Sequence, residues 1–192
     1  MDEKMRCPWA GNDPIYVNYH DKEWGVPVFD DKTLFEMLIL DGFQAGLSWI
    51  TILKKRDNFR IAFDYFDPYK IAQYDDIKKN QLMQNPLIIR NKLKIEAAIN
   101  NARQYIRIIE SKGSFSNYIW DFVDGRPIVN KWKEVRQIPT STKYSDKMSI
   151  QMKKDGFSFV GTTICYAFMQ AAGLVNDHLI CCFRYDEILK LY

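Results

Sequence analysis

Apolar residues recur at helical spacing along almost the whole of this chain, and this pattern limits its fold more than any other feature. The pattern is framed by helix start signals. Asp13-Pro14 is typical of an N-cap followed by proline in the first helical turn. A helix that begins there carries Tyr16 and His20 on one face, four residues apart. The sequence therefore predicts an all-α fold.

We expect about seven or eight helices joined by short links. One begins at Asp30 or Asp31 and breaks near Gly42, and the next runs from about Leu47 to Phe63. Further helical patterns cover 75–84, 90–112, 115–123, 145–154 and 162–172, whereas the strand candidate at 157–160 is short and isolated. No repeat or low-complexity segment divides the chain. We therefore expect one domain over residues 1–192, with two helical lobes around one cleft as the open alternative.

Charge and composition restrict the cellular setting. The 192 residues include 27 Lys and Arg against 24 Asp and Glu, a net charge of +3, which allows a local basic face for nucleic acid without requiring one. The first six residues are too polar for a signal peptide, and no apolar stretch approaches the ~20 residues that span a bilayer. We expect a cytoplasmic protein with no membrane partner, in which disulfides are disfavoured.

The chain has only two histidines, His20 and His178, and each has a cysteine nearby. Cys7 precedes His20 by thirteen residues, and Cys182 follows His178 by four, a spacing that can place both side chains on one helical turn. Zinc binds a Cys2His2 set as a closed tetrahedron with no open position, so such an ion is structural. Two ordinary histidines with two buried thiols are the alternative, and Cys181 competes with Cys182 as the ligand.

An acidic residue interrupts an apolar helical stripe. Leu34, Met37, Leu38 and Asp41 follow the i, i+3, i+4, i+7 rule, so Asp41 occupies a position expected to be apolar. A buried charge is unfavourable unless it is paired or used. Asp41 is therefore either a carboxylate at the floor of a cleft or a helix-terminal residue that reaches solvent beside Gly42.

Two links near this stripe are candidate nucleic-acid contacts. Residues 42–49 contain two glycines between apolar helices, with Leu47 at the tip as either a wedge or a core residue. Residues 86–92 separate two helical patterns and end in a basic group that includes Arg90 and Lys92. This second link is either a helix-hairpin-helix, in which Arg90 and Lys92 bind a DNA phosphate, or a solvated basic turn.

Five blocks of the chain match a known family pattern. They are Asp13-Pro14-x-Tyr16-x-x-Tyr19-His20-Asp21-x-Glu23-Trp24-Gly25-Val26-Pro27, Gln44-Ala45-Gly46-Leu47-Ser48-Trp49-x-Thr51-x-Leu53-Lys54-Lys55-Arg56, Ile138-Pro139-Thr140-Ser141-Thr142, Gly156-Phe157-x-Phe159-Val160-Gly161-Thr162-Thr163-Ile164-Cys165-Tyr166 and Gly173-Leu174-Val175-Asn176-Asp177-His178. With these blocks the chain resembles DNA-3-methyladenine glycosylase I from Cys7 to Cys182.

The resemblance implies a helix-hairpin-helix DNA glycosylase fold whose termini are joined by a structural zinc. It implies a base excision repair enzyme that flips 3-methyladenine out of alkylated double-stranded DNA and hydrolyses its N-glycosidic bond, and we expect it to act as a monomer. By the same resemblance the zinc ligands are Cys7, His20, His178 and Cys182, the base pocket is lined by Trp9, Tyr16, Tyr19 and Trp49, the catalytic carboxylate is Asp41, and Leu47 fills the gap left in the duplex.

Two positions depart from the family pattern. Better-known members carry Glu where this chain has Asp41, and we expect glycine at the hairpin position of Leu87. A glycosylase of shifted alkylpurine specificity and a zinc-clasped damage-binding protein without excision activity are therefore the alternatives.

Overall fold

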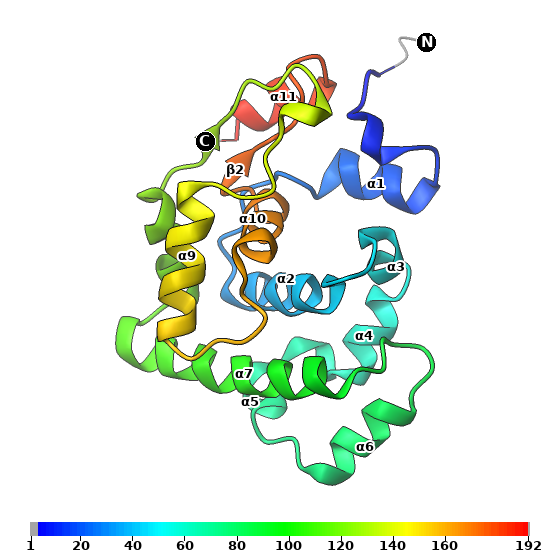
Figure 1. Cartoon of the computed structure of the whole chain (residues 1–192), viewed down its shortest axis with the longest axis vertical. Coiled ribbons are helices and arrows are strands. Elements are labelled where there is room, and N and C mark those ends of the chain that lie inside the picture. Colours follow the sequence, from blue (N-terminus) through cyan, green and yellow to red (C-terminus); the bar gives the residue numbers. More distant parts are fainter. Residues whose placement is uncertain (1–3, 192) are drawn as a thin grey trace.

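The computed structural model of the chain describes residues 4–191 and is built mainly of α-helices (Figure 1). The helices are α1 (Pro14–Lys22), α2 (Asp31–Gln44), α3 (Trp49–Leu53), α4 (Arg56–Ala62), α5 (Pro68–Ile71), α6 (Asp76–Gln84), α7 (Lys92–Lys112), α8 (Phe115–Trp120), α9 (Lys143–Lys154), α10 (Thr162–Ala171) and α11 (Phe183–Leu189). Four single 3-10 turns lie between them: η1 (Pro8–Ala10), η2 (Asp64–Phe66), η3 (Asp121–Val123) and η4 (Val135–Gln137). None of the helices within residues 4–191 combines the length and the apolar character needed to cross a membrane.

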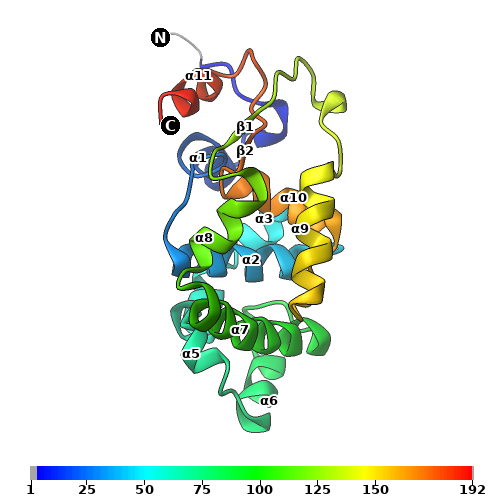
Figure 2. The same cartoon turned by 90° about the vertical axis from the view of Figure 1, so that its left-hand side faces the viewer.

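Helix α2 runs through the middle of the molecule, with α10 on one side and α7 on the other (Figures 1 and 2). Its apolar residues are buried on more than one face, as Leu34, Phe35, Leu38, Ile39 and Leu40 show. This position explains why its sequence is nearly all apolar, since a helix covered on several sides has no wide polar face. The large aromatic core that α2 shares with its neighbours includes Phe43, Phe59, Phe115, Tyr118 and Phe168.

Side-chain caps begin most of the longer helices, as the sequence predicts. The Asp13 carboxylate accepts a hydrogen bond from the Ile15 amide at the start of α1, and Asp75 accepts one from Lys78 at the start of α6. Each cap satisfies a backbone N–H that the first helical turn leaves free. The predicted helices are confirmed in type, and their ends are shifted by a few residues.

Two predicted helix boundaries are wrong. Helix α2 does not break at Gly42 but continues to Gln44, and Gly42 lies inside it facing Phe159. The segment 47–63 is not one helix but two, α3 and α4, because the chain turns at Lys54 and Lys55. Apolar periodicity alone does not reveal such a turn, since both halves bury residues in the same core.

A small parallel strand pair was not predicted. Strand β1 (Ile128–Val129) pairs with β2 (Val175–Asn176), and the register places Ile128 opposite Val175. Segment 157–160, the strand candidate of the sequence, forms no strand, and Phe159 has a left-handed φ of 56°. The fold is thus mostly helical, with one short pairing that directs the chain after α10 toward α11 (Figure 2).

The first and last described segments of the chain meet at one end of the molecule. The segment before α1 lies beside the segment that joins β2 to α11, and the Phe183 amide donates a hydrogen bond to the Met5 carbonyl. Cys7, Leu179 and Cys182 form a small buried cluster there, separate from the main core. This meeting point contains both histidines of the chain.

Candidate functional site

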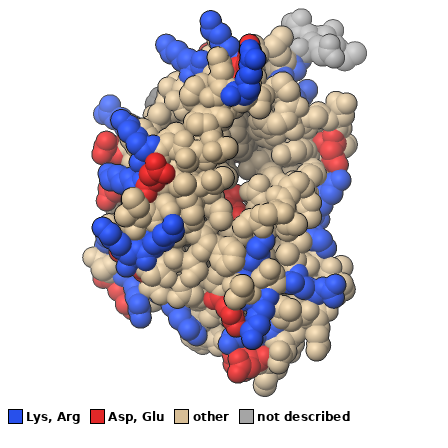
Figure 3. Space-filling view, in the orientation of Figure 1, with Lys and Arg blue, Asp and Glu red and all other residues tan. Residues whose placement is uncertain are grey.

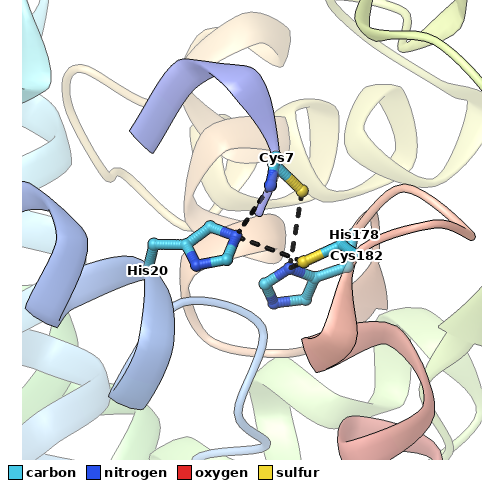
Figure 4. Close-up of side chains that lie close together, drawn as sticks. All are labelled: Cys7, His20, His178 and Cys182. Carbon is cyan, nitrogen blue, oxygen red and sulfur yellow. Dashed lines mark hydrogen bonds between the residues drawn. The ribbon is translucent and has the colours of Figure 1, made fainter. Parts of the chain in front are cut away.

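Four buried side chains, Cys7, His20, His178 and Cys182, converge where the two ends of the chain meet (Figure 4). The Cys182 sulfur lies 3.4 Å from His20 Nε2 and 3.6 Å from His178 Nδ1, and the Cys7 sulfur lies 3.6 Å from His178 Nδ1. In a zinc tetrahedron with ordinary bond lengths, a sulfur and a nitrogen ligand are about 3.5 Å apart. These three separations match those of a tetrahedral zinc site, and all four donor atoms lie within 4.8 Å of one another.

The polypeptide brings these donors together from two distant segments. Cys7 immediately precedes η1 and His20 lies in α1, whereas His178 and Cys182 belong to the link from β2 to α11. The prediction that His178 and Cys182 share a helical turn is wrong. A tight turn, closed by the Cys182 amide donating to the Leu179 carbonyl, returns Cys182 to His178. Cys181 is exposed and lies outside the donor set.

Surrounding groups orient each imidazole toward the centre of the site. His20 Nδ1 lies 2.8 Å from Asp21 Oδ1, and His178 Nε2 lies 3.0 Å from the Trp24 carbonyl oxygen. The other nitrogen of each ring, His20 Nε2 and His178 Nδ1, faces the Cys182 sulfur, an arrangement usual for metal-binding histidines. Gly25 permits the close approach at His178, since a Cβ there would lie 3.1 Å from His178 Nε2.

One of the two thiols, that of Cys182, is held in a form suited to binding a metal. The hydrogen bond with Cys7, followed by those with His178 and His20, lowers the pKa of the Cys182 thiol. A thiolate is the form in which cysteine binds zinc. The donor set therefore fits a metal ion, and with four protein ligands such an ion has no open position for a substrate.

A cavity of about 360 Å³ lies next to this cluster. Helices α1, α2 and α3 supply one side of it, and α10 together with residues 135–140 supplies the other; the space-filling view shows the molecule hollowed in this region (Figure 3). Its lining is mostly aromatic and apolar. The lining residues are Trp9, Tyr16, Tyr19, Trp24, Asp41, Gln44, Trp49, Val135, Ile138, Pro139, Thr140, Thr163, Tyr166, Ala167, Gln170 and Ala171.

The aromatic wall of the cavity is continuous. The Trp9 ring centroid lies 5.1 Å from that of Tyr16 and 4.8 Å from that of Trp24, and Tyr19 lies 5.4 Å from Trp49. Tyr16 and Tyr19 are stacked at 6.5 Å. All four aromatic residues predicted from the sequence thus line one cavity, and Trp24 joins them. Rings at these separations contact one another directly, so together they present a continuous aromatic surface to a planar ligand in the cavity.

Asp41 lies in the wall of this cavity, near the C-terminus of α2. It is 3% exposed, so the alternative of a helix-terminal carboxylate in solvent is wrong. Burial raises the pKa of Asp41 well above the usual range of an aspartate. Within residues 4–191, its Oδ2 atom and the Nε1 atom of Trp49 are buried without a hydrogen-bond partner. Buried polar atoms of this kind are rare in proteins and mark places where a ligand can bind.

The contribution of α10 to the cavity was not predicted from the sequence. Tyr166 and Gln170 line the cavity and donate hydrogen bonds to the same Asp177 carboxylate oxygen, at 2.6 and 2.8 Å. Asn130 and Trp132 donate to the other oxygen, so this fully buried carboxylate has four partners. The one available signal was the polar side chain of Gln170, four residues after Tyr166 in an otherwise apolar helix.

Leu47 lies on a tight turn directly after α2. The Leu47 amide donates to the Gln44 carbonyl at 2.6 Å, with Ala45 at φ −44° and ψ 117° and Gly46 at φ +77°. These angles define a type II turn, which requires glycine at its third position. Leu47 is 40% exposed, so the core alternative is wrong and an apolar side chain projects from the surface here.

The link between α6 and α7 forms a compact hairpin over residues 85–91. Arg90 and Lys92 are exposed at its end. Lys55 donates to the carbonyls of Pro86 and Leu87, which fixes the hairpin against the start of α4. No residue between 85 and 91 has a positive φ. Leucine at position 87 is therefore compatible with this turn, and the expectation that glycine is needed there is wrong.

Comparisons with known proteins agree in family and in fold. Residues 9–185 match the family model described as methyladenine glycosylase. The chain is 52% identical to "DNA-3-methyladenine glycosylase 1" of Escherichia coli (strain K12) over 94% of this chain and 96% of that protein. A crystal structure of a 3-methyladenine DNA glycosylase I superposes with a TM-score of 0.92 at 52% identity, covering 93% of this chain and 98% of the other. A Staphylococcus aureus 3-methyladenine DNA glycosylase I, whose structure concerns 3-methyladenine recognition, has a TM-score of 0.90 at 38% identity, with 93% and 95% coverage.

Proposed function

The chain belongs to the methyladenine glycosylase family, a family of DNA base excision repair enzymes, and we propose that it releases 3-methyladenine from alkylated DNA by taking the flipped base into the aromatic cavity beside Asp41. The observation that carries this proposal is a buried Asp41 oxygen that has no hydrogen-bond partner within residues 4–191 and lies in a wall of contacting aromatic rings. A base must leave the stack to reach such a cavity.

The charge of the lesion accounts for its selection. 3-Methyladenine in DNA is a cation, whereas adenine is neutral. Aromatic faces attract a cation by about 0.5–2 kcal/mol, and a cationic base beside Asp41 favours the ionised form of this carboxyl group, which then adds an opposite charge in the cavity wall. The cavity therefore favours the methylated base over the normal one.

Because the methylated base already carries a positive charge, it does not need to be protonated strongly by the enzyme before the glycosidic bond breaks. When the C1′–N9 bond breaks, its electron pair neutralises the positive charge of the base, which leaves as a neutral molecule. Water then supplies the oxygen that bonds to C1′ and releases a proton to solvent. The protein contributes chiefly by holding the cationic base and excluding bulk water, interactions that lower the barrier only if they favour the transition state. We assign Asp41 as the carboxylate that faces the cationic base in the cavity.

Residues on one side of the cavity are suited to contact the duplex. We propose that Leu47, projecting from its turn, fills the space that the flipped base leaves, as apolar wedges do in bent DNA. Arg90 and Lys92, exposed at the end of the hairpin, bind phosphate together with free N–H groups at the start of α7. The substrate is then double-stranded alkylated DNA.

We propose zinc as the ion of the Cys2His2 cluster, because its donor types, separations and closed coordination are those of structural zinc sites. The residues that hold it are Cys7, His20, His178 and Cys182. Zinc there ties the N-terminal segment to the β2–α11 link. We further propose that the 192 residues form one domain that acts as a monomer in the cytoplasm, where its free thiols stay reduced.

Mass spectrometry of the bases released from methylated duplex DNA tests this function. We expect 3-methyladenine to be released, and Asp41→Asn to lower the rate by about 10-fold or more. Asp57→Asn, which changes an exposed carboxylate, is the matched control and should leave the rate unchanged. Release of other alkylpurines in preference to 3-methyladenine points to shifted specificity, and release of no base contradicts the proposal.

A further inference from the structure

Lys94 differs from the other basic residues of the hairpin because its side chain is turned inward. It is 8% exposed, whereas Arg90 and Lys92 are exposed. Its Nζ atom donates to the carbonyl oxygens of Phe43 at 2.8 Å and Ala45 at 2.6 Å. A buried ammonium is unfavourable unless it is bound, so this side chain has a specific task within the protein rather than on DNA.

The two carbonyls that Lys94 binds lie at the very end of α2. The last carbonyls of a helix have no intrahelical partner and carry the negative end of the helix dipole, so an ammonium is favourable there. Phe43 and Ala45 flank Gln44, whose own carbonyl accepts from the Leu47 amide. The Lys94 ammonium therefore binds the backbone on both sides of Gln44, the first residue of the type II turn.

The turn and the hairpin are the two parts of the protein that meet DNA in the proposed function. Lys94 belongs to the first turn of α7, where its amide also donates to the Asn91 cap. One residue is thus fixed to the hairpin by its backbone and to the Leu47 turn by its side chain.

We propose that Lys94 is a positioning residue that holds the Leu47 turn at a fixed place relative to the hairpin. Phosphate binding at the hairpin then brings Leu47 to the base stack in register with the flipped nucleotide. This inference rests on the proposed function, since it assigns Lys94 to the DNA-binding step of that reaction and not to the base cavity.

A double-mutant cycle tests it. Lys94→Met keeps the length and removes the ammonium, and we expect its excision rate on methylated duplex DNA to fall by up to about 10-fold, no more than the loss expected for Leu47→Ala. Leu47→Ala should lower the rate as well. If Lys94 acts through Leu47, the double variant should be no slower than Leu47→Ala within about twofold, because two changes along one path are not additive. Multiplication of the two losses in the double variant would overturn the inference.

Binding of free 3-methyladenine separates positioning from a damaged pocket. Its affinity, measured by quenching of tryptophan fluorescence, should stay within about twofold in Lys94→Met, because the cavity lining does not include Lys94. A parallel loss of free-base affinity and excision would contradict a role through the wedge. Lys112→Met, at the other end of α7, is the control and should match the wild type.

Amide exchange gives a measurement that does not depend on activity. The Leu47 amide should exchange faster in Lys94→Met than in the wild type, while amides in α10 should be unchanged. Unchanged exchange at Leu47 would show that Lys94 does not hold the turn, even if the wild type releases no base and the proposed function fails. Should Lys94→Met not fold, Lys94→Gln, which keeps a polar donor, takes its place with the same expected directions.

Discussion

The Nε2 atom of His178 lies 3.0 Å from the carbonyl oxygen of Trp24, so a residue of the Cys2His2 cluster is hydrogen-bonded to a residue that lines the aromatic cavity. The rings meet as well: Trp24 lies 4.6 Å from His178, and Trp9 lies 5.1 Å from His20. The cluster therefore supports the aromatic wall from behind, in addition to joining two distant segments.

Loss of a metal ligand should destabilise the protein and loosen this wall. We expect His178→Ala to lose bound zinc and about 3 kcal/mol or more of stability, or roughly 6–12 °C in Tm for a chain of this size. Affinity for 3-methyladenine should fall with it, because Trp24 and Trp9 lose their support. Metal analysis, calorimetry and base titration of the same preparations check this.

Cys181 provides the matched control for that experiment. Cys181→Ser changes an exposed thiol next to the ligand Cys182 and should leave zinc content and Tm unchanged. Loss of zinc in Cys181→Ser, or its retention in Cys182→Ser, would contradict the assignment of the donor set.

Asp41→Asn should raise the stability of the ligand-free protein while it impairs excision. Because burial raises the pKa of Asp41, the folded state keeps its proton at pH values where the unfolded chain has released it. The free energy of unfolding therefore falls as pH rises from the ordinary aspartate pKa toward the raised one, and levels off above it. The neutral amide removes this fall, so we expect a gain of about 1 kcal/mol or more near pH 7, roughly 2–4 °C in Tm.

Thermal unfolding of both proteins between about pH 4 and pH 8 measures this difference. The gap between variant and wild type should widen as pH rises. A constant gap, or a variant less stable than the wild type near neutral pH, would show that Asp41 is ionised and well accommodated in the folded protein.

Leu47→Ala should slow excision from duplex DNA, with smaller effects on excision from single strands and on the stability of the protein. The side chain is 40% exposed, so its truncation should change stability by no more than about 0.5 kcal/mol. We expect excision from duplex DNA to fall about 10-fold and excision from single strands to fall less, because only the duplex has a gap to fill. Equal losses on the two substrates would remove Leu47 from the wedge role.

Arg90→Ala and Lys92→Ala should weaken DNA binding regardless of sequence. Each should reduce the slope of log affinity against log salt by about 1, as expected for the loss of one phosphate contact. Binding titrations at several salt concentrations check this, with Lys112→Ala as the control on the same helix. A variant whose slope is unchanged has lost no phosphate contact.

Features that depend on interactions within one helical turn could be predicted from the sequence. Caps such as Asp13 and Asp75 act within one helical turn, so the starts of α1 and α6 could be predicted closely. The break between α3 and α4 and the pairing of β1 with β2 depend on packing between residues distant in the chain. Neither leaves a periodic trace in the sequence.

The same distinction applies to the residues of the candidate sites. The metal-binding residues were found because both histidines of the chain belong to one cluster, and Asp41 because it interrupts an apolar stripe. Tyr166 and Gln170 were missed because the packing that brings α10 to the cavity joins residues distant in the chain, and their shared hydrogen bonds to Asp177 leave no periodic pattern in the sequence. In the sequence, Lys94 belongs to the same basic stretch as Arg90 and Lys92. Its burial in the structure is what distinguishes it from these two exposed residues.

The Cys2His2 cluster can form only late in the synthesis of the chain. Its donors Cys7 and His178 are separated by 171 positions, so the ribosome must complete nearly all of the chain before the site can close. Until then the early half of the site, with Trp9 and Trp24 beside it, has no partner to hold it. With the proposed ion, the aromatic wall is finished only when translation is almost over and the metal has bound, so we expect the yield of active enzyme to depend on metal supply during synthesis.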